Sequence, residues 1–261
     1  MRLLVLLAFI GAACAKPQQN GRIIGGSIAD INKYPFIAHV DLFVVWEYNP
    51  TCGSTLITST AVVTTAYCVG LTAPHYFRVR LGTAALTGGT AIKVAENILH
   101  ENYNWRLREG DIAIMRLAAA APLSNSIRIA RLAGPNYALP DNLQLNVAGW
   151  GHFGPSTDRS PQLRHVTVRV INHNVCRMRW DEFRARPHRG DLPHVLPGNI
   201  CTGPLGNSAQ GSCDWDFGGP VVHQGDVLVA IVGWQYLCGE PDYPTVDMSV
   251  PFYINWILER L

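Results

Sequence analysis

Cysteine is the residue type with the most sharply defined chemistry in this chain of 261 residues. The sequence holds seven cysteines, and Cys14 falls in an N-terminal apolar segment. The other six are Cys52, Cys68, Cys176, Cys201, Cys213 and Cys238. An even number is typical of disulfides formed in an oxidising compartment, although six cysteines allow many pairings. A zinc site is disfavoured because no C-x-x-C or histidine cluster occurs at ligand spacing, so we expect neither metal nor cofactor.

The N-terminus has the pattern of a secretory signal peptide. Arg2 precedes an apolar run over residues 3–10, and Ala13-Cys14-Ala15 supplies a small-x-small cleavage site. The alternative, a buried N-terminal helix, explains neither the charged start nor the cleavage site. We therefore expect residues 1–15 to be removed and the chain to be secreted. No second apolar run is long enough to span a bilayer, so we expect no membrane partner.

Composition excludes several other classes of protein. Charged residues make up 15% of the chain and the formal net charge is +2. The charged fraction is too low for a disordered chain or a coiled coil, and the net charge argues against a nucleic-acid partner. A chain of this length can bury a core without a metal or a partner, so we expect a monomer.

Short apolar runs separated by turn residues predict a mostly β protein. Strands are expected at residues 36–40, 61–65, 77–81 and 227–232, and helices near residues 174–184 and 250–261. Many short strands with glycine and proline turns indicate a barrel or a sandwich. An alanine-rich stretch followed by Gly-Pro, within residues 117–140, could join two half-domains.

Five motifs, in order, resemble those of the trypsin-like serine proteases. They are Arg22-Ile23-Ile24-Gly25-Gly26, Cys52-Gly53-Ser54-Thr55-Leu56-Ile57, Asp111-Ile112-Ala113-Ile114-Met115-Arg116-Leu117, Gly149-Trp150-Gly151 and Gly218-Gly219-Pro220. Residues 162–166 and 133–137 are similar to digestive enzymes of insects, especially moths. The resemblance implies an all-β fold of two packed six-stranded antiparallel β-barrels with a C-terminal helix. It implies a short activation propeptide at residues 16–22, a protease-like domain at 23–261, and the disulfides Cys52–Cys68, Cys176–Cys201 and Cys213–Cys238.

The catalytic positions depart from the family pattern. The resemblance places a histidine where this chain has Tyr67, and the nucleophilic serine where it has Phe217; Asp111 alone keeps its type. A phenol is a proton donor at neutral pH, and a phenyl ring carries no nucleophile. We expect the buried Asp111 carboxylate to accept a hydrogen bond from the Tyr67 hydroxyl. A substitute dyad, for example Ser212 with a displaced histidine, is the alternative.

The oxyanion, pocket and activation positions also bear on function. Trp215 replaces an oxyanion-hole glycine, whose backbone freedom a Cβ restricts. The pocket base maps to Gly211, which does not support a preference for basic residues, and its walls map to Gly233, Trp234, Gln235 and Thr245. Trp215, Phe217 and Trp234 could form an aromatic plug. Cleavage after Arg22 would free the Ile23 amine, which the resemblance pairs with Asp216.

An arginine cluster stands apart from these motifs. Its members are interleaved with Trp180 and Phe183 and comprise Arg177, Arg179, Arg184, Arg186 and Arg189. It could bind a polyanion, but nearby acidic residues favour a solvated helix face.

The sequence therefore predicts a secreted homologue of the trypsin-like proteases that is not an enzyme and acts by binding. Its partner would be a protease, an inhibitor or a small ligand. The alternative is a secreted chymotrypsin-like digestive endopeptidase with a non-standard catalytic group, and a structural or storage role is a third possibility.

Overall fold

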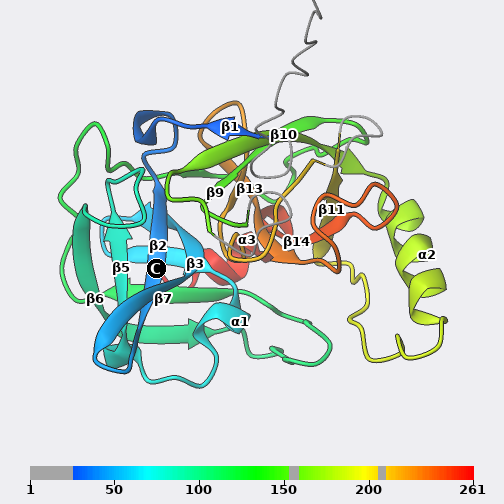
Figure 1. The fold of residues 1–261 in the computed structure, drawn as a ribbon, viewed down its shortest axis with the longest axis horizontal. Helices are drawn as coiled ribbons and strands as arrows, with labels where there is room; N and C mark the ends of the chain where they lie inside the picture. The colour runs from blue at the N-terminus through cyan, green and yellow to red at the C-terminus, as the bar shows by residue number, and fades with distance from the viewer. Residues whose placement is uncertain (1–25, 153–158, 205–209) are drawn as a thin grey trace, which may run out of the picture.

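The structure is a computed structural model that describes residues 26–152, 159–204 and 210–261 (Figure 1). The predicted signal peptide and propeptide, with Arg22 and Ile23, lie outside the described residues. Two β-barrels pack side by side. The first is built from the N-terminal strands in blue to green, and the second lies nearer the C-terminus in sequence.

Six antiparallel strands close the first barrel. In ring order they are β2 (Ile37–Val44), β3 (Glu47–Thr58), β4 (Ala61–Thr64), β7 (Ala113–Leu117), β6 (Thr90–Leu99) and β5 (Phe77–Leu81). Strand β5 shows why this sequence forms barrel strands. Its apolar residues are buried and alternate with two arginines that face outward, as the two-residue period of a strand requires.

The second barrel also closes with six antiparallel strands, because β10 pairs with both β11 and β9. Its ring order is β9 (Gln144–Gly149), β10 (Arg164–Ile171), β11 (Asn199–Gly203), β14 (Thr245–Ser249), β13 (Val227–Trp234) and β12 (Pro220–His223). Strand β1 (Ser27–Ile28) extends this sheet at β10, and β8 (Arg131–Leu132) pairs in parallel with β13. Every residue of β13 is buried, which explains its continuous apolar run.

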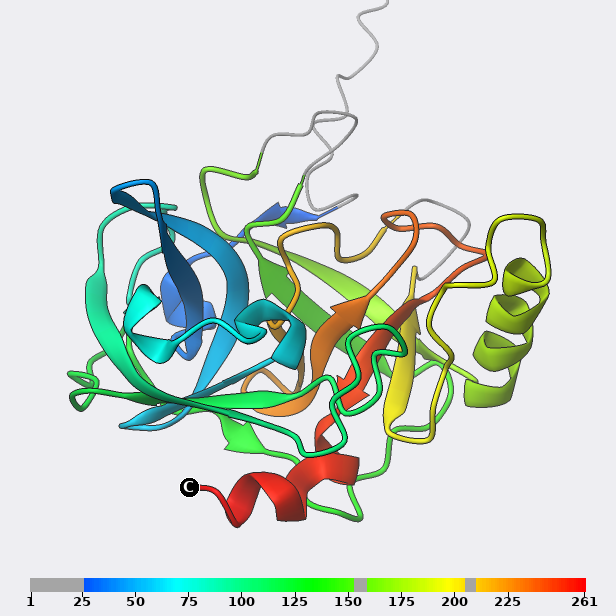
Figure 2. The ribbon, with the colours of Figure 1, turned by 90° about the horizontal axis from the view of Figure 1, so that it is seen from below.

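Helices are few and short in the described residues. There, the α-helices are α1 (Ala66–Val69), α2 (His173–Arg184) and α3 (Val250–Leu258), and single 3-10 turns occur at Ile31–Lys33 and Pro74–Tyr76. The Asn172 side chain caps α2 by accepting from the backbone N–H groups of Asn174 and Val175. Figure 2 shows α3, in red, at the C-terminal end, where its apolar face joins the core of the second barrel.

The predicted fold class is confirmed, including the C-terminal helix. The connection between the barrels runs from β7 to β9 through the predicted seam at residues 117–140. The structure contains the three disulfides that the resemblance implies, Cys52–Cys68, Cys176–Cys201 and Cys213–Cys238. In the described part of the chain, no helix is both long and apolar enough to cross a bilayer.

Candidate functional site

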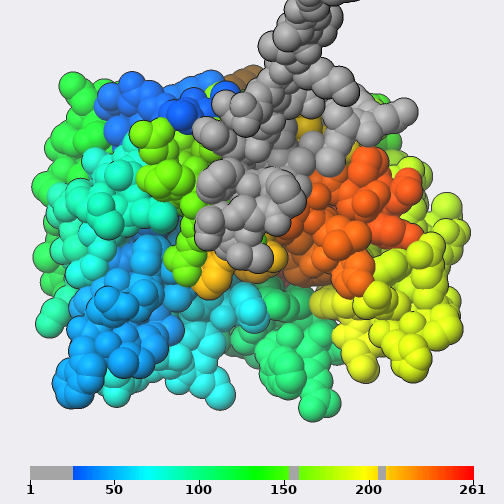
Figure 3. All heavy atoms as spheres, viewed as in Figure 1, coloured from blue at the N-terminus to red at the C-terminus, as the bar shows by residue number. Residues whose placement is uncertain are grey.

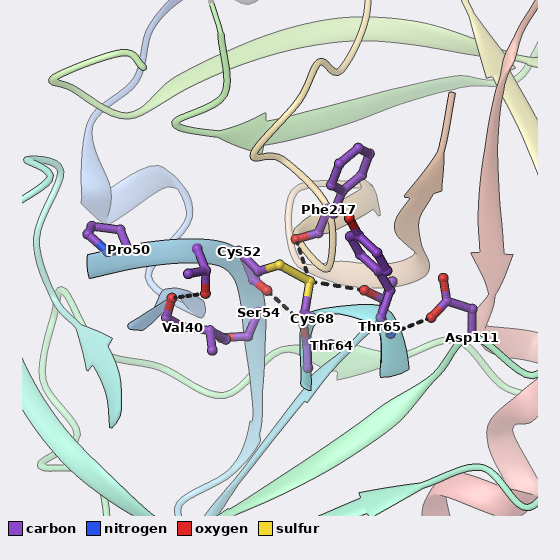
Figure 4. Close-up of a disulfide and its surroundings, with 12 residues drawn as sticks. Val40, Pro50, Cys52, Ser54, Thr64, Thr65, Cys68, Asp111 and Phe217 are labelled. Carbon is purple, nitrogen blue, oxygen red and sulfur yellow. Dashed lines mark hydrogen bonds between the residues drawn. A yellow bond between two sulfur atoms is a disulfide. The ribbon is translucent and has the colours of Figure 1, made fainter. Parts of the chain in front are cut away.

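Three segments bring the predicted catalytic positions together where the barrels meet. Tyr67 lies at the start of α1, Asp111 precedes β7, and Phe217 precedes β12. The backbone N–H of Tyr67 donates to Asp111 Oδ1 at 2.7 Å, and the Tyr67 and Phe217 ring centroids lie 6.0 Å apart, nearly edge to face. Figure 4 shows Phe217 above the Cys52–Cys68 disulfide and Asp111 farther to the right. The fold therefore assembles the family's three positions with different side chains in two of them.

Asp111 is completely buried, and its partners differ from the expected one. The Tyr67 hydroxyl was predicted to bond this carboxylate, and that prediction is wrong. Arg108 supplies the second partner instead, with Nη1 3.2 Å from Asp111 Oδ2. The same guanidinium lies over the Tyr67 ring, its Cζ 3.5 Å from the centroid, and the Tyr67 side chain is half exposed. Burial raises the pKa of Asp111, while Arg108 and the Tyr67 N–H oppose that rise.

Sequence reasoning missed Arg108. It lies three residues before Asp111, in the loop that leads from β6 to β7, and no family motif covers it. The only available signal was a cation close in sequence to a carboxylate that had to be buried. Because an uncompensated buried charge is costly, such a cation is a natural partner.

Phe217 forms part of the contact between the barrels. Its ring packs against both large apolar clusters, one centred on each barrel. Its backbone is also held, because the Phe217 carbonyl accepts from the Gly53 N–H at 2.8 Å and lies 3.5 Å from Cys68 Sγ. Substituting a serine hydroxyl by this ring thus converts a polar position into apolar packing.

Trp215 keeps the backbone conformation that the resemblance associates with glycine, with φ at 77°. A side chain there is strained, since positive φ is uncommon for residues with a Cβ. Its indole Nε1 donates to His152 Nε2 at 2.6 Å, and the Arg159 guanidinium lies 3.5 Å above the ring. These two contacts hold the indole to one side of the site.

The predicted aromatic plug is wrong. Among the described residues, no ring contact joins Trp215, Phe217 and Trp234 to one another. Trp234 instead packs against Trp180 of α2, with centroids 4.7 Å apart, in a separate apolar cluster. The sequence alone could not show which neighbours each ring would contact, because the family's motifs place all three positions near the cleft.

Two of the predicted pocket residues, Gln235 and Thr245, form a hydrogen-bonded group with Ser212. The Ser212 hydroxyl lies 3.2 Å from Thr245 Oγ1, and the Gln235 side-chain amide lies 3.3 Å from Ser212 Oγ and 3.4 Å from Thr245 Oγ1. Gly211 and Gly233 are both buried beside them. Because Ser212 is 2% exposed and already bonded, it is poorly placed to act as a nucleophile.

Asp216 is a second fully buried carboxylate. It accepts from the backbone N–H groups of Cys213 at 2.9 Å and Gly151 at 2.8 Å. A Cβ added to Gly149 or Gly151 would overlap its carboxylate, which explains the glycines around Trp150. Burial raises the pKa of Asp216 to about 7, and the two N–H groups only partly offset that effect. The predicted pairing with Ile23 cannot be located here because that residue lies outside the described ones.

A groove of about 760 Å³ leads away from Tyr67 along the junction of the barrels. Figure 3 shows one face of the molecule, on which the segment after β6 and the segment after α2 face each other at the lower edge. Trp105 and Arg106 come from the first segment, Gly190 and Leu192 from the second, and Gln235 from the end of β13. The groove thus begins at Tyr67, one of the family's three catalytic positions, and is lined by both halves of the protein. Within the described ranges, no cluster of three potential metal ligands occurs.

Comparison with known proteins agrees with the fold and with the arrangement of the site. A family model described as Trypsin matches residues 23–257. "Trypsin, alkaline C" of Manduca sexta is 35% identical over 263 residues, covering 98% of each chain. "Trypsin CFT-1" of Choristoneura fumiferana is 32% identical over 252 residues, covering 95% of this chain and 94% of that one. The solved structure of neuropsin, a serine protease of mouse brain, is 27% identical, with a TM-score of 0.74 over 90% of this chain and 98% of its own.

The chain belongs to the trypsin family, and its resemblance to insect members of that family is confirmed. The sequence prediction that it is not an enzyme is wrong on these comparisons, because relatives at 32–35% identity over nearly their whole length are named as trypsins. Residues 67 and 217 are still tyrosine and phenylalanine. These two side chains alone do not establish that the whole protein is not an enzyme.

Proposed function

We propose that this chain binds an extended polypeptide segment in the groove between its barrels. The observation that carries the proposal is the groove itself, which starts at Tyr67 and draws its walls from both halves of the protein. Concave sites at the junction of two structural units are a common location for ligands. Polypeptide binding is the step common to an endopeptidase of this family and to a partner-binding homologue of it.

Cleavage of the bound segment is the activity that the trypsin relatives favour. It would require a non-standard catalytic group, since Tyr67 and Phe217 supply neither the usual base nor the usual nucleophile. Asp111 cannot take over either role as it stands, because it is buried and paired with Arg108. The chemistry to look for is therefore a hydroxyl or a base from elsewhere in the cleft.

Peptide binding and turnover can be measured on the same material. The full chain and the chain cleaved after Arg22 are titrated with labelled extended peptides, with binding followed by fluorescence anisotropy and products by mass spectrometry. We expect saturable binding by at least one form. If neither form binds any peptide, the proposal is rejected.

A serine-reactive fluorophosphonate identifies any active hydroxyl. Stoichiometric labelling together with peptide cleavage would establish a non-standard nucleophile, and the Ser212→Ala variant is the matched control. Loss of labelling in that variant would assign the reaction to Ser212. Retained labelling would direct the search to another serine.

Secretion is part of the same proposal. Its support is the sequence of residues 1–15 and the three disulfides, which are typical of oxidising compartments. Recovery of the mature chain from culture medium, beginning after residue 15, is the expected result.

A further inference from the structure

We infer that the groove prefers acidic polypeptide segments, an inference that rests on the polypeptide binding proposed above. Three arginines line the groove, against one aspartate: Arg106, Arg108 and Arg184 against Asp191. Charge complementarity between a binding surface and its partner governs which segments are accepted. An acidic segment fits this excess of guanidinium groups, whereas a basic one would meet repulsion.

The three arginines differ in how far their charge is already balanced. Arg108 is paired with the buried Asp111, so it adds little to the net charge of the groove. Arg184 donates from Nε to the Leu192 carbonyl at 2.8 Å, and its Nη1 lies 2.8 Å from His194 Nδ1. Its ion pair is with Asp181, where Nη1 lies 3.7 Å from Oδ1, and the other oxygen of that carboxylate lies 3.9 Å from Arg177. Because two arginines share one carboxylate, the charge of Arg184 is only partly balanced.

Arg106 is the most accessible of the three. It is exposed, and within the described residues no ion pair joins it to a carboxylate. Its guanidinium lies 5.1 Å from the centroid of the Trp105 ring, which is itself 66% exposed. An arginine resting on an exposed indole presents a charge and an apolar surface together. This pair suits an acidic residue that has an apolar neighbour.

The wall formed by the segment after α2 adds further positive charge to the groove. Arg189 from the segment after α2 lies with its Cζ 4.6 Å from the ring centroid of Tyr236, and Tyr236 lines the groove. Part of the arginine cluster noticed in the sequence thus borders the groove instead of forming only a solvated helix face. On this same wall, Asp191 is the one carboxylate in the lining, so it reduces the positive charge without cancelling it.

The preference for acidic segments is tested with three capped tetrapeptides. Each has apolar residues at both ends and two identical central residues, which are glutamate, glutamine or lysine. Binding to the full chain is measured by calorimetry at low salt. We expect the glutamate peptide to bind about tenfold more tightly than the glutamine peptide and the lysine peptide to bind most weakly. The difference should shrink when salt is raised to about 0.5 M, because exposed charges are screened.

Two arginine variants complete the test. Arg106→Ala is expected to weaken glutamate-peptide binding about fivefold and to weaken glutamine-peptide binding less, as suits loss of an exposed ion pair. Arg128→Ala, an exposed arginine outside the groove lining, is the matched control and should change neither. Equal affinity for the glutamate and glutamine peptides, or equal behaviour of the two variants, would overturn the acidic preference and leave polypeptide binding standing. Failure of all three peptides to bind would count against both proposals.

Discussion

Arg108 Nη1 lies 3.2 Å from Oδ2 of Asp111, so a guanidinium compensates the buried carboxylate that the trypsin family uses to orient a histidine. The Asp111 side chain is completely buried, and that of Arg108 is 17% exposed. Together with the Tyr67 N–H, Arg108 supplies the charge and hydrogen bonds that a buried carboxylate needs. The pair explains how this site accommodates Tyr67 without losing Asp111.

Removing the cation should therefore destabilise the protein in a pH-dependent way. The Arg108→Ala variant is expected to lose about 2–4 kcal/mol of unfolding free energy at pH 8, since breaking a buried pair leaves one charge uncompensated. The pKa of Asp111 is already raised by burial, and loss of Arg108 would raise it further. The loss of stability should be smaller near pH 4, where the carboxyl becomes neutral.

Denaturant unfolding at the two pH values measures this effect. In the double variant Arg108→Ala/Asp111→Asn, no charge remains to be compensated, so much of the stability at pH 8 should return. An equal loss at both pH values, with no recovery in the double variant, would mean that Arg108 acts through packing alone.

Ionisation of Asp247 should lower the free energy of unfolding as pH rises. The Asp247 carboxyl is fully buried and accepts hydrogen bonds from Thr202 Oγ1 at 2.6 Å and from the backbone N–H of Gly233, in the predicted pocket wall. Burial raises its pKa to about 7 from 3.8. A carboxyl with a raised folded-state pKa contributes stability that is present below about pH 4 and is lost as pH rises through 7.

Asp247→Asn is therefore expected to be more stable than the parent at pH 9, by on the order of 2 kcal/mol, and close to it at pH 4. Unfolding curves at both pH values provide the measurement. Asp226→Asn is the control, because Asp226 is an exposed carboxylate paired with Arg131, and its pKa is lowered. If Asp247→Asn were less stable than the parent at pH 9, ionisation of Asp247 would not be a source of alkaline destabilisation.

Cleavage after Arg22 should change the titration of Asp216. In the described residues, its carboxylate accepts from two backbone N–H groups and pairs with no cation. A new amine at Ile23 would favour the ionised carboxylate and lower its pKa from about 7. The cleaved form should then lose less stability between pH 5 and pH 9 than the intact form.

Calorimetric melting of both forms across this pH range tests the effect. An Arg22→Gln variant treated with the same activating protease controls for cleavage elsewhere in the chain. Parallel pH profiles for cleaved and intact material would show that the Ile23 amine does not reach Asp216.

Restoring the family's groups should reveal how much Arg108 obstructs the usual chemistry. Tyr67→His with Phe217→Ser supplies an imidazole and a hydroxyl, groups that together contribute up to about 10⁶ in turnover. We expect this double variant to exceed the parent in kcat/KM for peptide substrates by much less than that, because Arg108 already occupies one oxygen of Asp111. Adding Arg108→Leu should raise kcat/KM further.

Steady-state assays on a fluorogenic peptide give the comparison, and Arg108→Leu alone is the control. If the added substitution brings no increase over the double variant, Arg108 is not the obstacle. The strained Trp215 backbone and indole would then be the next position to change.

The sequence by itself predicted the fold class and the identity of the altered positions, and the disulfide pairing followed only from the resemblance to the trypsin-like family. Local patterns and the order of the family motifs were sufficient for the fold class. Strand β5 alternates apolar residues with arginines, β13 is apolar throughout, and five motifs occur in the family's order. Asp111 could also be recognised as buried, since it sits directly before an apolar strand inside a family motif.

Only the tertiary structure decided what the side chains contact. The side chain that donates to Asp111 is that of Arg108 and not the Tyr67 hydroxyl, and the three rings of the predicted plug contact three different partners. These outcomes depend on loop paths and on the packing of one barrel against the other. The ring contacts join residues far apart in sequence, and Arg108 meets Asp111, three residues away, only through the path of their loop. No local period or motif encodes either kind of contact, and the arginine-lined groove became visible only when both of its walls were in place.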